Sequence, residues 1–428
     1  MIRRLDAAAA DFSESLASLR NLPSTAVQEV VADVIRRVRE EGDAALLAFS
    51  EKFDGFRPDT AAGFYAPVSA AAKTQISPPL LEALEKAAAR VSDYHQRQMP
   101  QAWEHTDSLG NMYGETITPV AHAAVYAPGG QAAYPSSVLM GVIPAKIAGV
   151  PKITLITPAT DGVLPPITLA AAAVAGADHV VMLGGAQAVA AAALGTETIS
   201  RADVIAGPGN VFVAEAKRQL YGEIGIDSLA GPSEVLIISD ESADPKWVAA
   251  DMMAQAEHDA IAQSIAISPN QEHLEQVAAE LAAETPRQPR AALIAESLSA
   301  RGALISAPDM EACCRIADEI AAEHVQIMCA DADSVAARIH NAGGVFIGAH
   351  SCVALGDYGA GPNHVLPTAQ TARFASPLGV GNFLRRAGVL RASAEGAAVW
   401  AETAAVLAEA EGLFAHAASA KLRMTPKT

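Results

Sequence analysis

Short apolar runs alternate with helical segments along the middle of the chain, beginning near residue 122. The apolar runs predict strands at residues 123–126, 153–157, 179–183 and 204–206. Helical patterns fill the intervals, and Gly or Pro stands at most of the joints. Such alternation is typical of βαβ units and of a parallel sheet.

A second series of the same kind follows. Strands are predicted at residues 234–239, 264–268, 303–306, 324–328 and 345–347, and helices at 246–257, 271–284, 309–320 and 332–341. A chain of 428 residues exceeds what one hydrophobic core usually supports. Two series therefore predict two α/β domains.

Both ends of the chain have a helical pattern instead. Residues 24–100 carry apolar residues at helical spacing, and an alanine-rich stretch at 396–417 predicts a helical tail. A tail of this kind often packs on a partner subunit.

Charge and hydropathy narrow the possible functions. The longest uncharged stretch, residues 116–145, contains four Pro and three Gly, so it predicts buried strands, turns and a helix instead of a membrane span. Thirty basic against 48 acidic residues, without a basic cluster, make nucleic acid an unexpected partner. We recognise no secretory signal, and we expect a cytoplasmic protein.

Several polar pairs could carry chemistry. Gln255 and His258 are three residues apart at a predicted helix end, which suits two ligands of one metal, although such a pair is common by chance. Glu323 and His324 enter an apolar strand, where an acid/base pair competes with a solvated strand entrance as the interpretation. Adjacent strand residues point to opposite faces, so both are buried only if the strand is just starting.

Two loops and the tail add further candidates. Asp357 and His364 lie in a Gly-rich segment that could equally be a structural turn. Glu411 and His416 lie on the tail, where spacing alone favours a structural role. The turn at 207–210 precedes a predicted helix and could approach a phosphate, but the Gly-x-Gly-x-x-Gly fingerprint is absent.

Taken together, these stretches resemble the histidinol dehydrogenase family. No single one is specific, but they follow the family's order over nearly the whole chain. The matching segments are Val125-Tyr126-Ala127-Pro128-Gly129-Gly130, Pro135-Ser136-Ser137-Val138-Leu139-Met140, Gly184-Gly185-Ala186-Gln187, Gly207-Pro208-Gly209-Asn210, Ala230-Gly231-Pro232-Ser233-Glu234, Gln255-Ala256-Glu257-His258, Glu323-His324 and Asn363-His364-Val365-Leu366-Pro367-Thr368.

The resemblance implies two incomplete Rossmann-like domains with parallel sheets, plus a helical N-terminal segment and a helical C-terminal tail. We expect the N-terminal segment at 1–50, a first α/β domain at 51–122 and 233–376 with the metal and catalytic residues, a second at 123–232 on the NAD side, and the tail at 377–428. The resemblance also implies a homodimer whose tails reach the partner subunit.

The implied reaction oxidises L-histidinol through L-histidinal to L-histidine with two NAD, at the end of histidine biosynthesis. One Zn²⁺ per site would be held by Gln255, His258, Asp357 and His416. Glu323 and His324 match the catalytic pair.

The implied contacts with the substrate and the cofactor come from further residues. The substrate-binding set comprises Ser233, Gln255, His258, His324, Asp357, His364, Glu411 and His416. Tyr126, Gln187 and Asn210 match cofactor contacts.

Two positions depart from the family's pattern. Val353 stands where many members have Glu, and Ala322 where Pro is frequent. The alternatives are a related dehydrogenase of another small polar alcohol, such as sulfopropanediol, a zinc hydrolase with Glu323 as the base, and a metal-storing protein. A carboxylate at Glu411 favours an imidazole over a sulfonate.

Overall fold

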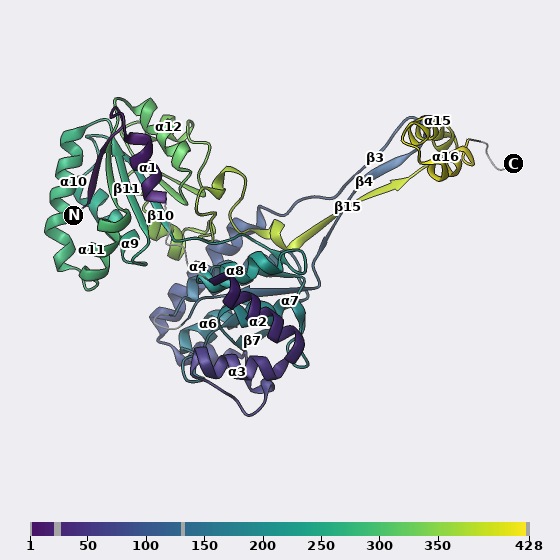
Figure 1. Cartoon of the computed structure of the whole chain (residues 1–428), viewed down its shortest axis with the longest axis horizontal. Coiled ribbons are helices and arrows are strands. Elements are labelled where there is room, and N and C mark those ends of the chain that lie inside the picture. Colours follow the sequence, from purple (N-terminus) through teal and green to yellow (C-terminus); the bar gives the residue numbers. More distant parts are fainter. Residues whose placement is uncertain (1, 21–26, 130–132, 425–428) are drawn as a thin grey trace. The chain divides into compact units, whose positions relative to one another are not determined.

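The computed structural model describes residues 2–20, 27–129 and 133–424, and it divides into two compact units (Figure 1). Unit 1 comprises residues 1–98 and 121–383, and unit 2 comprises 99–120 and 384–428. Gly130, which belongs to one of the family-like segments, lies outside the described residues.

The first sheet of unit 1 has six parallel strands in the order β1-β12-β11-β10-β13-β14. The strand order reverses between β10 and β13. From β10 the chain adds β11 and β12 on one side, and it then returns to add β13 and β14 on the other side of β10. The strands are β1 (Arg3–Asp6), β10 (Glu234–Ser239), β11 (Gln263–Ser268), β12 (Ala303–Ser306), β13 (His324–Met328) and β14 (Gly344–Ile347).

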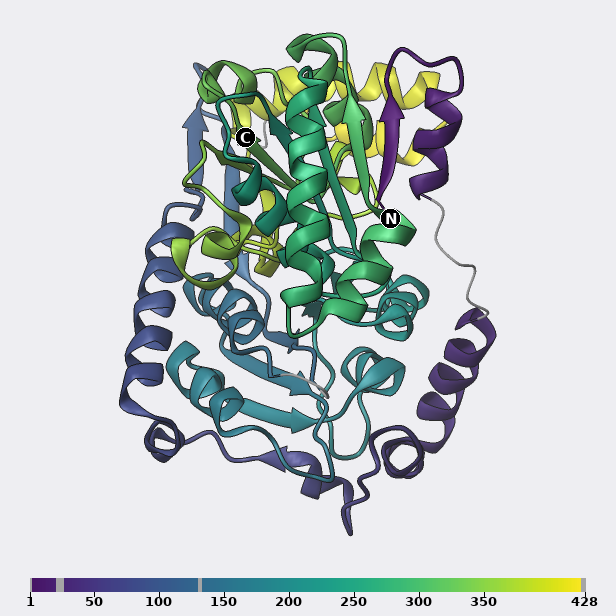
Figure 2. The ribbon, with the colours of Figure 1, turned by 90° about the vertical axis from the view of Figure 1, so that its left-hand side faces the viewer.

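Helices cover both faces of this sheet, which explains why its central strands are buried along their whole length (Figure 2). One face packs on α9 (Pro245–Ala256), α10 (Gln271–Glu284) and α11 (Ala291–Arg301), with a short 3₁₀ turn η3 (Thr285–Arg287) between the last two. The other face packs on α1 (Phe12–Arg20) and α12 (Met310–Ile320). The shorter helices that follow are α13 (Ala332–Ala336), α14 (Val353–Leu355), a π-helical turn η4 (Gly356–Ala360), η5 (Thr371–Arg373) and η6 (Val380–Phe383).

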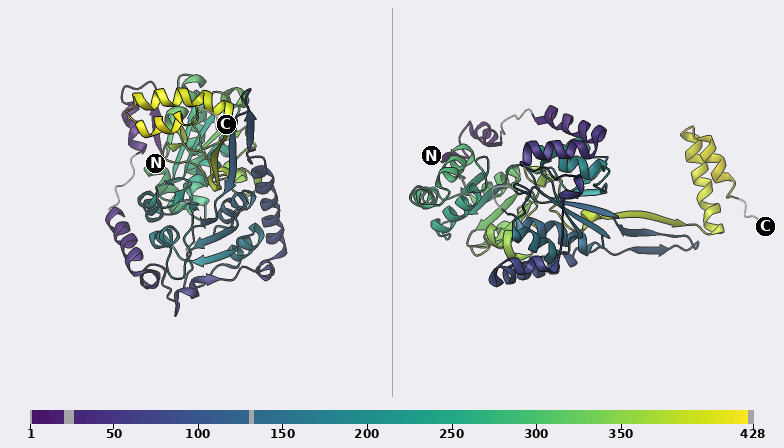
Figure 3. Two further views of the ribbon diagram at one scale, coloured as in Figure 1. Left: turned by 90° about the vertical axis from the view of Figure 1, so that its right-hand side faces the viewer. Right: turned by 90° about the horizontal axis from the view of Figure 1, so that it is seen from below.

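The second sheet of unit 1 has the order β2-β7-β6-β5-β8-β9 and is parallel except for β2 (Figure 3). It again reverses next to its first central strand, here between β5 and β8. The strands are β2 (Tyr65–Ala66), β5 (His122–Tyr126), β6 (Lys152–Thr157), β7 (His179–Met182), β8 (Val204–Ala206) and β9 (Gly225–Ile226).

Alanine-rich helices pack closely on this sheet. One core joins it to α2 (Val27–Glu41), α3 (Asp43–Asp54), α7 (Gly185–Leu194) and α8 (Val211–Leu220). The remaining elements are η1 (Ala61–Phe64), η2 (Ala70–Gln75), α4 (Pro78–Gln96), α5 (Pro135–Ile147) and α6 (Pro166–Ala175).

The N-terminal hundred residues differ from the expected domain boundaries in two ways. The segment 1–50 is not wholly helical, because β1 forms an edge strand beside β12. Residues 51–122 were expected with the first domain, but β2 pairs with β7 of the second sheet. The apolar stripe of α2, with Val31 and Val34, also packs in the hydrophobic core of the second sheet. Burial of this stripe therefore assigns α2 to the second α/β domain.

Unit 2 is an antiparallel three-stranded sheet that leads to a helical pair. Its strands are β3 (Trp103–Thr106), β4 (Met112–Pro119) and β15 (Leu384–Arg391), in the order β15-β4-β3. The tail predicted as one helix is two, α15 (Ala394–Ala410) and α16 (Phe414–Lys421). Gly412, at φ 75°, makes the break.

The two predicted α/β series are confirmed, with strand bounds that agree within about one residue. The uncharged stretch 116–145 contains the end of β4, all of β5 and most of α5. Within the described part of the chain, no helix is both long and apolar enough to cross a membrane.

Candidate active site

Glu323 and His324 stand at the beginning of β13, beside the start of β10. The register pairs His324 with Val235. Both side chains are buried, at 6% and 5% exposure. Helices cover both faces of this sheet, so adjacent residues at the entrance of β13 can both be buried.

The main chain of Glu234 holds both side chains. Its N–H donates to Glu323 Oε2 at 2.9 Å, and its carbonyl oxygen lies 2.8 Å from His324 Nδ1. A carbonyl only accepts, so Nδ1 carries the hydrogen and Nε2 keeps a free lone pair. Nε2 is buried without a hydrogen-bond partner among the described residues.

Burial shifts the two pKa values in opposite directions. Desolvation raises the pKa of Glu323 well above its usual range, and nearby Glu234 and Asp357 raise it further against the Glu234 N–H bond. Desolvation lowers the pKa of His324 to about 4, although the Glu234 carbonyl opposes this. His324 is therefore a neutral imidazole near pH 7, and Glu323 is a carboxyl able to exchange a proton nearer neutrality.

Three of the four predicted metal ligands line one small cavity of about 60 Å³, namely Gln255, His258 and Asp357. Gln255 lies in the last turn of α9, and His258 follows one turn later at the exposed rim. Asp357 projects from the π-helical turn η4, a distortion often found at functional sites.

The charge states of this cavity suit a cation. Desolvation raises the pKa of Asp357 to about 6 and lowers that of His258, with Glu257 opposing and Arg290 reinforcing the His258 shift. Gln255 Nε2 is buried without a hydrogen-bond partner in the described structure. Exchanging the amide atoms would aim an oxygen at a cation instead.

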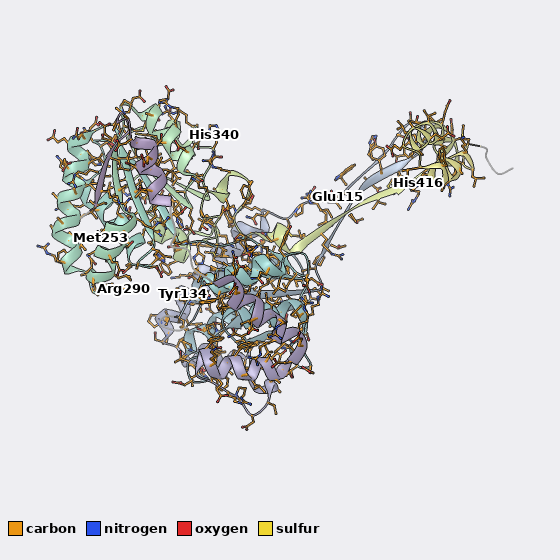
Figure 4. The ribbon with its side chains drawn as sticks, viewed as in Figure 1. Glu115, Tyr134, Met253, Arg290, His340 and His416 are labelled. Carbon is orange, nitrogen blue, oxygen red and sulfur yellow. The ribbon has the colours of Figure 1, made fainter. Side chains whose placement is uncertain are left out.

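Within the described residues, no group of three or more His, Cys, Asp or Glu side chains could hold a metal ion. The cavity offers one imidazole, one carboxylate and an amide from the predicted set. The fourth predicted ligand, His416, is exposed on α16 of unit 2 (Figure 4). The ligand set is therefore incomplete within unit 1.

His364 lies close to this group of side chains. Its Nδ1 is 3.9 Å from Asp357 Oδ1, and its Nε2 is 3.4 Å from Ser137 Oγ. Burial lowers its pKa to about 4, with His324 and His258 adding to the shift. The preceding Asn363 fixes the loop, because its amide donates to the Met140 carbonyl at 2.8 Å.

The other predicted substrate contacts are less concentrated. Ser233 is half-buried just before β10, and its carbonyl accepts the Gln263 N–H at 2.9 Å. Glu411 is exposed in unit 2, on the C-terminal side of α15. Val353, the departure from the family pattern, lines the same cavity as Gln255 and Asp357.

The predicted cofactor residues Tyr126, Gln187 and Asn210 line a second cavity of about 630 Å³. Its walls follow the carboxyl ends of β5, β6, β7 and β8, at the reversal point where open α/β sheets bind ligands. The Tyr126 hydroxyl accepts the Gly185 N–H at 3.2 Å, and Asn210 caps α8.

Sequence reasoning missed some of the residues that shape these places. The Glu234 main chain leaves no side-chain signature. Lys217 and Asp227 form a buried ion pair at 2.7 Å and clasp the Gly207 peptide, as Lys217 donates to its carbonyl and Asp227 accepts its N–H. The sequence signal for this pair was weak, namely two residues of opposite charge ten positions apart.

A larger cavity of about 870 Å³ contains none of the predicted site residues. One of its walls is Phe346, whose ring centroid lies 5.9 Å from that of His324.

Comparisons with known proteins agree on one family. Residues 19–424 match the sequence model of histidinol dehydrogenase. A histidinol dehydrogenase from Pseudomonas syringae pv. syringae strain B728a is 47% identical over 429 residues, 99% of this chain and 96% of that protein. One from Nitrosospira multiformis is 45% identical over 431 residues, 100% of this chain and 98% of that protein.

A crystal structure supports the same conclusion. Histidinol dehydrogenase from Elizabethkingia anophelis superposes with a TM-score of 0.92 at 31% identity, covering 99% of this chain and 98% of that one. This likeness confirms the predicted fold of two Rossmann-like α/β domains. The chain belongs to the histidinol dehydrogenase family.

Proposed function

We propose that this protein is a zinc-dependent histidinol dehydrogenase that oxidises L-histidinol through L-histidinal to L-histidine with two NAD. The proposal rests on the two main-chain contacts of Glu234, with Glu323 through its N–H and with His324 through its carbonyl, which we call the Glu234 clamp. They hold a neutral imidazole and a buried carboxyl side by side. The full-length relatives named histidinol dehydrogenase support the same activity.

His324 acts in the alcohol step. Its free Nε2 accepts the hydroxyl proton of L-histidinol as hydride leaves the neighbouring carbon. The hydrogen bond from Nδ1 to the Glu234 carbonyl keeps Nε2 as the basic nitrogen, and it stabilises the imidazolium that forms. NAD, when bound, supplies the hydride acceptor, and zinc, when bound, supplies a Lewis acid toward the amino alcohol.

Glu323 acts in the aldehyde step. Its carboxylate accepts a proton from the water that adds to the L-histidinal carbonyl, and the resulting carboxylic acid returns this proton to the former carbonyl oxygen, giving a hydrate. Transfer of a hydride from the hydrate to a second NAD, with loss of a proton, then gives the acid. Its raised pKa suits this task, because a base is most effective when its pKa lies near the working pH.

The metal would be held by Gln255, His258 and Asp357 together with His416. Imidazole, carboxylate and amide donors suit Zn²⁺, and the Gln255 amide, whose Nε2 has no hydrogen-bond partner among the described residues, supports this assignment. Ser233, His324, His364 and Glu411 would contact the substrate along with the four ligands. Tyr126, Gln187 and Asn210 would contact NAD.

The fourth ligand would come from a partner subunit. In unit 2, α15 and α16 expose apolar side chains that include Val406, Phe414 and Leu422, at 62%, 71% and 78% exposure. Exposed apolar groups of this kind favour association. A homodimer would bury them and could bring His416 and Glu411 of one chain to the cavity of the other.

Substrate identity is tested by supplying purified protein with L-histidinol or with sulfopropanediol and NAD, and recording NADH. We expect turnover of L-histidinol. Turnover of only the other alcohol would overturn the substrate assignment. Catalysis of a hydrolytic reaction without nicotinamide, and none with it, would instead favour the zinc hydrolase.

A further inference from the structure

We propose that Asp54 makes the second cavity select NAD over NADP, by accepting hydrogen bonds from the free ribose hydroxyls and repelling a 2′-phosphate. This inference rests on the proposed function, which requires a nicotinamide dinucleotide in this cavity. It adds a specificity-determining residue to the three predicted contacts.

The charge of the cavity wall carries the first step of the argument. Among the described residues that line it, Asp54 is the one carboxylate, and no Lys or Arg is present. The buried cation Lys217 does not line the cavity, because it is bound to Asp227 and to the Gly207 carbonyl. The 2′-phosphate of NADP would therefore face the Asp54 carboxylate, with no Lys or Arg among the described lining residues to balance its charge.

The arrangement of apolar groups indicates which end of the dinucleotide meets Asp54. Pro128 and Gly129 belong to the segment that leads to α5, whose Ser137 contacts His364, so this part of the wall leads toward the reaction centre. Val30 and Phe53 come from α2 and α3 and are 47% and 49% exposed. Exposed apolar and aromatic groups suit the flat faces of adenine.

Asp54 directly follows Phe53 at the end of α3 and lines the same cavity, so it would face the ribose attached to an adenine that packs on Phe53. Its Oδ2 is buried and has no hydrogen-bond partner among the described residues. Desolvation raises the pKa of Asp54, and the neighbouring Gly184 main chain and Gln187 side chain oppose this shift. A buried acceptor without a partner is costly, and a ribose hydroxyl would satisfy it.

Lys52 is the alternative receptor for a 2′-phosphate. Its Nζ lies 5.0 Å from the centroid of the Phe53 ring, but Lys52 does not line the cavity. The two residues make opposite predictions. Removing the Asp54 charge should make NADP bind more tightly relative to NAD. Removing the Lys52 charge should make NADP bind more weakly relative to NAD, but only if Lys52 receives the 2′-phosphate.

The experiment measures dissociation constants of NAD and NADP by titration calorimetry, using the full-length protein and its Asp54→Asn, Asp54→Ala and Lys52→Met variants. The control is Asp59→Asn, which removes an exposed carboxylate five residues further along the chain. We expect tighter binding of NAD in the unmodified protein. We also expect the dissociation constant of NADP divided by that of NAD to fall at least about tenfold in both Asp54 variants, since a charge near the phosphate changes binding by at least about that factor.

An unchanged ratio in folded Asp54 variants would overturn the proposal, as would an equal change in Asp59→Asn. Steady-state kinetics with L-histidinol provides a second readout, with the expected effect in KM for the dinucleotide and little in kcat. If L-histidinol is not oxidised but the binding ratio shifts as expected, the proposed reaction fails while the role of Asp54 holds. Absence of binding by either dinucleotide would overturn both.

Discussion

The Nδ1 atom of His324 lies 2.8 Å from the main-chain oxygen of Glu234, so a main-chain atom determines which imidazole nitrogen is the base. Because β10 and β13 are adjacent and parallel, the strand register itself orients the candidate base.

Removing that base should abolish most activity. We expect His324→Ala to lower kcat for L-histidinol by about 10²–10⁴, the usual contribution of general base catalysis. The variant with both Glu323→Gln and His324→Ala should be at least as impaired. His340→Ala, an exposed histidine outside these cavities, is the control. Normal turnover by the double variant would contradict the proposed mechanism.

The aldehyde step should depend on pH through Glu323. Its carboxylate form is the base, and burial raises its pKa, so the rate with supplied L-histidinal should rise as pH increases through that raised pKa. Glu323→Gln should be slow and should lack this rise. A profile that keeps the same rise in the Gln variant would assign it to another group.

Metal retention tests the small cavity. His258→Ala and Asp357→Asn should each lower zinc content and activity, because each removes one of the few donors there. Chelation should inactivate the unmodified protein, and added Zn²⁺ should restore it. Full zinc in purified His258→Ala, measured by elemental analysis, is the outcome that excludes this cavity as the metal site.

Mixing two inactive variants tests the shared site. If His416 serves the partner subunit, a dimer of one Glu323→Gln chain and one His416→Ala chain has one intact site. Random exchange of chains should then restore about a quarter of the unmodified activity, since half of the dimers are mixed. No recovery after proven exchange would place His416 in the site of its own chain.

Stability should show the effect of a neutral buried histidine. His122 bonds the Arg201 carbonyl through Nδ1 and Thr154 Oγ1 through Nε2, and burial lowers its pKa. At acidic pH the unfolded chain therefore binds a proton on His122 that the folded chain does not. The contribution of neutral His122 to the free energy of unfolding is full above a pH of about 6.5 and is lost as pH falls toward the pKa of the folded state.

The measurement is the free energy of unfolding of His122→Gln relative to the unmodified protein, from denaturant titrations at pH 7.5 and 5.5. The difference should shrink at the lower pH by up to about 1.4 kcal/mol per pH unit. A difference that grows on acidification would contradict the sign. The neighbouring charges of Lys152, Asp203 and His179 are unchanged in the variant.

The sequence predicted the two α/β series well because their strands are buried on both faces and are continuously apolar. β10 is an example, since the run Val235–Ile238 contains only apolar residues. β1 was not predictable, because four residues with three charges pair with a partner 300 positions away. The pairing of β4 with β15 is equally non-local.

The candidate site divides in the same way. Side chains in ordered motifs, such as Gln255 and His258, were predicted and do line one cavity. The Glu234 clamp and the open acceptor of Asp54 depend on tertiary contacts that no local pattern encodes. The position of His416 relative to the cavity depends on a second chain under our proposal, and no single-chain pattern contains it.

The most direct test of the proposed function counts the NADH formed when a limiting, known amount of L-histidinol is consumed by purified protein with excess NAD. The proposed four-electron oxidation predicts two NADH and one L-histidine for each L-histidinol. One NADH with accumulation of L-histidinal, or no NADH at all, would contradict it.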